Sequence, residues 1–226
     1  MYDIMLSSGM SMVESAMALW GPANKFRGHH TIVGLEHLAR AQQEGRGVLL
    51  MGSHQITLDV TARVMGYHFG YDLLYRKDAN PLLAFMLTRA RLTFLDNAIV
   101  RSDTRQLIKN LKQKHVVWYA PDQDYGAKHS IFAPFFGVPA ASVLGTMRIT
   151  KMSNAMVIPL SHYRDEHNCY HIILGEPLEN FPSGDDLVDA TRVNRIIEMA
   201  IRKQPDQYLW VHRRFKTRPS GEPRVY

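Results

Sequence analysis

Short apolar runs alternate with longer amphipathic segments along nearly the whole chain, and this alternation constrains the fold most strongly. The run GVLLMGSH (47–54) is bounded by glycines and contains no acidic or basic side chain before its histidine, as expected of a buried strand. Strands that alternate with helices imply an α/β fold with a mixed, largely parallel central sheet flanked by helices. Strands are predicted at 47–54, 71–75, 98–100, 115–121, 156–160, 170–174 and 208–212. Helices are predicted at 1–20, 35–44, 57–65, 81–92, 104–114 and 187–203.

The composition fits one folded domain spanning residues 1–226. Hydrophobic residues make up 46% of the chain and charged residues 21%, which allows a sizeable core and excludes wholesale disorder. The single cysteine, Cys169, excludes an internal disulfide framework and a multi-cysteine metal site, and we expect it to be structural. The formal net charge of +6 favours a polyanionic partner: nucleic acid, anionic lipid head groups or an acidic protein.

The N-terminal segment is apolar and rich in methionine, but Asp3 and Glu14 interrupt it. No stretch of the sequence supplies the roughly 18 uncharged apolar residues that a membrane span needs. The segment also lacks the basic start of a signal peptide. We therefore expect a flexible core helix here, with contact to a membrane surface as the alternative.

His54 and Asp59 form an H-x4-D spacing at the end of the first predicted strand. A carboxylate beside a histidine fixes its tautomer and stabilises the imidazolium, so the other ring nitrogen can act as a general base. The spacing alone is weak, because His171 and Glu176 repeat it as an expected exposed strand histidine and turn carboxylate. His54 instead precedes a predicted helix, and strand-to-helix turns are where open α/β sheets place their sites. The two side chains can meet only if the chain turns between them.

Two further polar features follow predicted strands. Asp122 and Asp124 lie in the stretch PDQDYG, where a turn is the ordinary interpretation and no further ligands follow at calcium-loop spacing. Arg101 lies between a predicted strand and the basic amphipathic helix that begins near Thr104. We expect His54, Asp122 and Arg101 to lie on the same edge of the sheet.

Several stretches together carry a family resemblance that covers nearly the whole chain. They are GLEHL (34–38), GSHQITLD (52–59), RKDANPLL (76–83), VVWYAPDQDYG (116–126), FAPFFGVPAA (132–141) and QYLWVHRRFKTRP (207–219). On these stretches the chain resembles the late bacterial lipid A biosynthesis acyltransferases of the lauroyl or palmitoleoyl type, within the glycerolipid and lysophospholipid acyltransferase superfamily. The resemblance implies a glycerol-phosphate acyltransferase-like fold. Relatives usually begin with a membrane helix, so we expect a shortened member or a fragment without it.

The resemblance also implies roles for individual residues. His54 would be the general base and Asp59 the residue that orients it, since the superfamily shares this motif. By its position in the chain, Arg101 matches the arginine with which the superfamily binds a substrate phosphate. Asp122 and Arg76 lie in matching stretches and are expected to contact substrate.

The implied reaction transfers a fatty acyl chain from acyl-carrier protein to a hydroxyl group of a Kdo-modified lipid A precursor. This phosphorylated glycolipid acceptor would be met at the cytoplasmic face of the inner membrane. Arg213 and Arg214 are expected to recruit the anionic acceptor or the acidic carrier protein. No metal, cofactor or nucleic-acid partner is implied. The alternatives are acylation of another glycolipid or lysophospholipid and, without catalysis, a peripheral module that binds anionic lipid.

Overall fold

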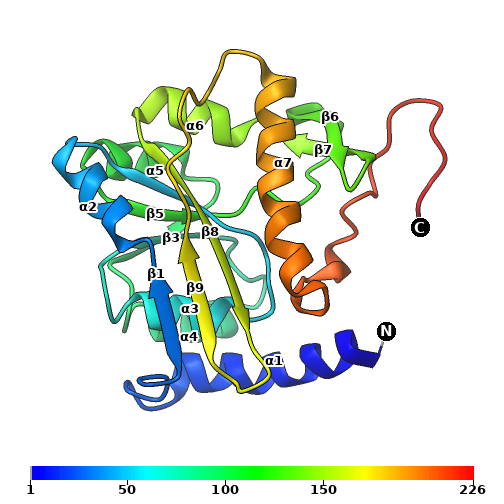
Figure 1. Ribbon diagram of the computed structural model, residues 1–226. Coiled ribbons are helices and arrows are strands. Elements are labelled where there is room, and N and C mark those ends of the chain that lie inside the picture. The colour runs from blue at the N-terminus through cyan, green and yellow to red at the C-terminus, as the bar shows by residue number, and fades with distance from the viewer. Residues whose placement is uncertain (1) are drawn as a thin grey trace.

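A seven-stranded sheet with helices on both faces forms the body of the protein (Figure 1). The computed structural model describes residues 2–226. The strands of the sheet follow the order β1-β9-β8-β2-β5-β3-β4. Their bounds are β1 His30–Val33, β2 Val48–Met51, β3 Asp72–Tyr75, β4 Asn97–Val100, β5 Val116–Tyr119, β8 Met156–Arg164 and β9 Tyr170–Leu174. The α-helices are α1 Tyr2–Trp20, α2 Leu35–Gln43, α3 Leu58–Met65, α4 Pro81–Arg91, α5 Thr104–Lys112, α6 Gly145–Ser153 and α7 Asp186–Lys203.

The sheet is mixed and largely parallel, as the alternation of strands and helices predicts. Strand β2 pairs in parallel with β5 and β8, and β3 pairs in parallel with β4 and β5. The edge strand β1 is parallel to β9, but β9 is antiparallel to β8. Five strands therefore end at one edge of the sheet, and the loops that follow β2, β5, β3 and β4 share that edge.

The two faces of the sheet bury separate hydrophobic cores. Successive side chains of a strand point to opposite faces, and in β2 Val48 and Leu50 enter one core while Leu49 and Met51 enter the other. Helices α1, α2 and α3 cover the first core, and helices α5, α6 and α7 cover the second. This double cover explains why β2 is apolar at every position.

A two-stranded hairpin outside the main sheet was not expected from the sequence. Strands β6 (Ser130–Phe135) and β7 (Val138–Val143) pair antiparallel and pack beside α7 (Figure 1). Pro134 lies opposite Pro139 in this hairpin. Proline cannot donate a ladder hydrogen bond, so the pattern argues against a central strand but is tolerated in a small separate ribbon. Strand β1 and helix α6 were also missed.

The predicted strand at 208–212 is wrong. The structure has short 3₁₀ turns, η2 (Pro205–Gln207) and η3 (Trp210–His212), and a single bridge between Gln55 and Tyr208. Both edges of β2 are already occupied, by β5 and β8, so no free strand edge is available there. A further 3₁₀ turn, η1 (Ala127–His129), precedes the hairpin.

Helix α1 lies across α3 and buries only part of its surface (Figure 1). Ala18 and Leu19 are buried, as is Glu14, which pairs with Arg164 of β8. Met5 and Met12 are 70% and 76% exposed, so the methionine-rich helix is not a core helix throughout. Across residues 2–226, no helix is both long and apolar enough to cross a membrane.

Candidate active site

His54 and Asp122 occupy matching positions beyond two paired strands. Met51 of β2 lies opposite Tyr119 of β5 in the parallel ladder. His54 and Asp122 each lie three residues beyond that pair, at the edge where both strands end. The register of the sheet thus places a histidine beside a carboxylate that is far from it in the sequence.

Asp122 holds His54 with two hydrogen bonds. The Nδ1 atom of His54 lies 2.6 Å from Oδ1 of Asp122, and the backbone N–H of His54 donates to Oδ2 at 2.8 Å. The Asp122 carboxylate is fully buried. Burial raises the pKa of this carboxyl, but the charge and the two hydrogen bonds of His54 outweigh burial and leave the pKa below its usual value. An ionised Asp122 accepts a hydrogen bond from Nδ1–H of His54, so the ring proton stays on Nδ1 and Nε2 is free to act as a base.

Gln123 and His212 surround the free nitrogen of His54. The side-chain amide of Gln123 donates to Nε2 of His54 at 3.1 Å and to Nε2 of His212 at 3.1 Å. The two imidazole rings lie edge to face with centroids 5.1 Å apart. Burial, followed by the charge of His54, lowers the pKa of His212 and favours its neutral form. Sequence analysis missed both residues, although Gln123 directly follows Asp122 and a histidine in a family-specific stretch was a signal for His212.

Asp59 does not contact His54, which corrects the expectation that it orients the base. Its Oδ1 atom lies 3.5 Å from the guanidinium of Arg91 at the end of α4. Within residues 2–226, no hydrogen bond or ion pair joins Asp59 to His54. Asp59 lies in the first turn of α3, as predicted, but the helix directs the carboxylate towards α4. The structure gives the role of partner to Asp122, which is too deeply buried to be the substrate contact that we expected.

Arg76 and Arg101 lie next to each other on the same edge. Tyr75 of β3 and Val100 of β4 are paired in the ladder, and each arginine follows its strand directly. Both side chains are exposed. The guanidinium of Arg101 lies over the ring of Tyr125 at 5.3 Å, so it is held near the His54 loop. The expected gathering of His54, Asp122 and Arg101 at one edge is therefore observed.

Arg214 is buried, so the expectation that it recruits anions is wrong. Its guanidinium donates to the carbonyl of Ala141, to Ser142 and to Asn194. Only 2% of the residue is exposed, and burial lowers the pKa of its side chain. It fastens the C-terminal segment to the hairpin and α7. Arg213, its neighbour, is exposed and remains a candidate for binding anions.

The second aspartate of the PDQD stretch also secures the C-terminal segment. Asp124 accepts hydrogen bonds from the backbone N–H and the hydroxyl of Thr217, at 2.8 and 2.9 Å. It also accepts from the N–H of Gly126, as in the turn that the sequence suggested. Asp122 thus binds His54 in the site, whereas Asp124 holds the C-terminal segment in place beside it.

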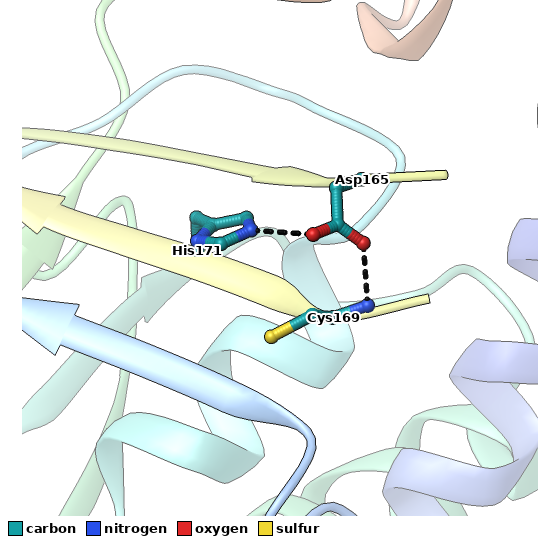
Figure 2. A group of neighbouring side chains, drawn as sticks. All are labelled: Asp165, Cys169 and His171. Atoms are coloured by element: carbon teal, nitrogen blue, oxygen red, sulfur yellow. Dashed lines mark hydrogen bonds and ion pairs between the residues drawn. The ribbon is translucent and has the colours of Figure 1, made fainter. Parts of the chain in front are cut away.

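A separate polar group lies at the tip of the β8–β9 hairpin, where Figure 2 shows Asp165, Cys169 and His171. Asp165 accepts from Nε2 of His171 at 2.8 Å and from the backbone N–H of Cys169 at 2.8 Å. The other ring nitrogen of His171 bonds to Thr31 of β1. Burial and the charge of Asp165 raise the pKa of the Cys169 thiol, which disfavours a nucleophilic thiolate. These contacts close the hairpin and occupy both ring nitrogens of His171.

Comparison with known proteins decides the family. The model of the bacterial lipid A biosynthesis acyltransferases matches residues 2–217. The chain belongs to this family. The lipid A biosynthesis palmitoleoyltransferase of Escherichia coli (strain K12) is 39% identical over 222 residues, which are 97% of this chain and 72% of that protein. The lipid A biosynthesis lauroyltransferase of the same strain is 37% identical, with the same coverage.

Membership confirms the prediction of an acyltransferase of late lipid A biosynthesis. A lipid A biosynthesis acyltransferase of Haemophilus influenzae is also similar, with 36% identity over 97% of this chain and 71% of that protein. Among solved structures, the 1-acyl-sn-glycerophosphate acyltransferase PlsC of Thermotoga maritima matches with a TM-score of 0.49. That match has 11% identity and covers 86% of this chain and 79% of PlsC.

Proposed function

We propose that the protein transfers a fatty acyl chain from acyl-carrier protein to a hydroxyl group of a Kdo-modified lipid A precursor. The observation that carries this proposal is the His54–Asp122 pair, which is held by two hydrogen bonds and presents Nε2 of His54 as a general base. The pair lies at the edge where open α/β sheets bind their ligands.

In the proposed reaction His54 removes the proton from the acceptor hydroxyl as that oxygen attacks the thioester carbon. The new C–O bond forms while the carbonyl electrons move to the carbonyl oxygen. Collapse of this tetrahedral intermediate breaks the C–S bond and expels the thiolate of the carrier. Nε2 of His54 returns the proton to the sulfur, so the products are the ester and the free thiol. No acyl-enzyme is needed.

Asp122 and Gln123 support different stages of this cycle. The ionised Asp122 stabilises the imidazolium that exists between the two proton transfers. Its lowered pKa favours the ionised carboxylate that this role needs. The Gln123 amide bonds to Nε2 in the free enzyme, so an acceptor hydroxyl must displace it to reach the base.

The acceptor proposal draws on exposed cations near His54 and on the names of the relatives. Arg76 and Arg101 directly follow two paired strands at the sheet edge, and guanidinium groups are suited to binding phosphate. Arg213 adds a further exposed cation close to His212 in the sequence. The relatives named above are lipid A biosynthesis enzymes, which supports a phosphorylated glycolipid as the acceptor.

We further propose that the reaction takes place at the cytoplasmic face of the inner membrane. Helix α4 supports this location, because Leu82 and Phe85 in its first half are 67% and 60% exposed and its last turn is basic. Changing both to aspartate should reduce flotation with vesicles that contain anionic phospholipid. Met199→Asp on α7, where the side chain is 59% exposed, is the control and should leave flotation unchanged. Equal flotation of both variants would contradict this location.

The experiment for the reaction is mass spectrometry of products from Kdo-modified lipid IVA and a pool of acyl-carrier proteins. We expect one added acyl chain and release of carrier thiol with the wild type. His54→Ala should abolish both, whereas His167→Ala should not, because His167 is exposed at the tip of the β8–β9 hairpin and makes no contact with His54 among the hydrogen bonds and ion pairs of residues 2–226. Turnover of only another glycolipid or a lysophospholipid would overturn the acceptor. No thiol release with any acceptor would favour a lipid-binding module.

A further inference from the structure

Helix α5 presents three cations on one exposed face. Arg105, Lys109 and Lys112 recur at intervals of four and three residues, which places them in one row along the helix. All three are exposed, and within residues 2–226 none of them takes part in an ion pair. The nearby Asp103 is engaged as the N-cap, where it accepts from the backbone N–H of Gln106. The row is therefore a patch of uncompensated positive charge.

The cations border a groove with apolar side chains in its wall. The groove has a volume of about 520 Å³, and Ile108 of α5 and Met152 of α6 line it together with the three cations. Met152 is 50% exposed and gives the groove an apolar wall beside the cations. Helices α5 and α6 pack together over the second core, so both sides of the groove are anchored by buried side chains (Figure 1).

A chain of contacts connects the start of α5 to the catalytic base. Arg101, which directly follows β4 and precedes the helix, lies over the ring of Tyr125. The hydroxyl of Tyr125 donates to Gln123 at 3.1 Å, and Gln123 donates to His54. A molecule lying along α5 therefore reaches the edge of the sheet that carries His54.

We propose that the α5 groove is the docking surface for the acyl-carrier protein. An acidic amphipathic helix would lay its apolar residues against Ile108 and Met152 and its carboxylates against Arg105, Lys109 and Lys112. Its acyl thioester would then enter the site from the end of α5 near Arg101. This inference rests on the proposed function, because it assumes a carrier-bound donor. It replaces Arg214 as the candidate contact for the carrier.

The test compares a donor on its protein carrier with a donor that has none. Reversing the three α5 cations to glutamate should raise KM for lauroyl-carrier protein about tenfold and flatten its salt dependence. The same variant should use lauroyl-pantetheine with kcat/KM within about twofold of wild type, because rim charges act on the protein partner. A control reverses two exposed cations of α7, Arg195 and Lys203, and should leave both donors unaffected.

The following results would contradict either the docking surface on α5 or the carrier-bound donor. An unchanged KM for lauroyl-carrier protein, or an equal loss with both donors, would overturn α5 as the docking surface. Loss of vesicle binding without a change in KM would assign the patch to lipid instead. If the triple variant does not fold, Lys109→Ala with Lys112→Ala must still raise KM for the carrier donor. A wild type that uses lauroyl-pantetheine but not lauroyl-carrier protein would instead overturn the proposed donor.

Discussion

Replacing Asp122 with asparagine should disable His54 by changing which ring nitrogen carries the proton. The backbone N–H of His54 donates to Oδ2 of Asp122, so the oxygen of an asparagine must occupy that position. Its amide N–H then points at Nδ1, 2.6 Å from Oδ1 in the wild type. Nδ1 must accept this hydrogen bond, which moves the ring proton to Nε2. The nitrogen that faces the substrate is then no longer a base.

The size of the loss follows from the two effects that Asp122 has on His54. Loss of general-base catalysis typically costs about 10²–10⁴-fold. The same Asp→Asn change beside the catalytic histidine of serine proteases costs about 10⁴-fold, through the wrong tautomer. We therefore expect kcat to fall by about 10³–10⁴. KM for either substrate should change little, because the carboxylate is fully buried.

Asp124→Asn is the matched control for this prediction. It makes the same chemical change two residues away, at a buried carboxylate that binds Thr217 and not His54. The assay is steady-state kinetics with saturating acceptor, with circular dichroism to confirm folding. We expect Asp124→Asn to keep kcat within about tenfold of wild type. A folded Asp122→Asn protein with comparable kcat would refute the assignment of Asp122 as the partner of His54.

Further predictions concern the neighbouring charges and the acid limit of stability. Asp59→Asn and Arg91→Gln should each lower activity and combine non-additively in a double-mutant cycle, because the two side chains form one ion pair; additive losses would contradict this. Asp59→Glu should be milder, because a carboxylate remains to face Arg91. Arg101→Ala should raise KM for the acceptor with little change in kcat, and an unchanged acceptor KM would exclude the phosphate contact. Burial, and then the charge of His54, lowers the pKa of His162 to about 3, whereas an unfolded histidine titrates near 6.5. The unfolded state thus binds more protons below about pH 6.5, and the free energy of unfolding should fall as the pH falls towards about 3. Urea titrations should show a shallower dependence on pH in His162→Gln, and an equal slope would contradict this.

Local sequence patterns determined the architecture of this protein to a large extent. Apolar runs such as VLLM in β2 and the helical spacing of α3 and α5 depend on which faces are buried, so they are readable in a single sequence. The position of His54 in a strand-to-helix turn could be predicted because the buried strand pattern precedes it and the helical spacing of α3 follows it. Elements with weaker local signals were missed, as the prolines of the β6–β7 hairpin illustrate.

Only the tertiary structure decided which residues meet at the site. Asp59 is five residues from His54, yet helix α3 turns it towards Arg91, while the β2–β5 register brings Asp122 to His54 across 68 positions. Likewise, Arg213 and Arg214 were both expected to recruit anions, but Arg214 is buried by contacts with distant segments. The periodicity of hydrophobic residues indicates which face of each segment is buried. Contacts between site residues depend instead on the order and register of the strands, which are set by how all segments pack together.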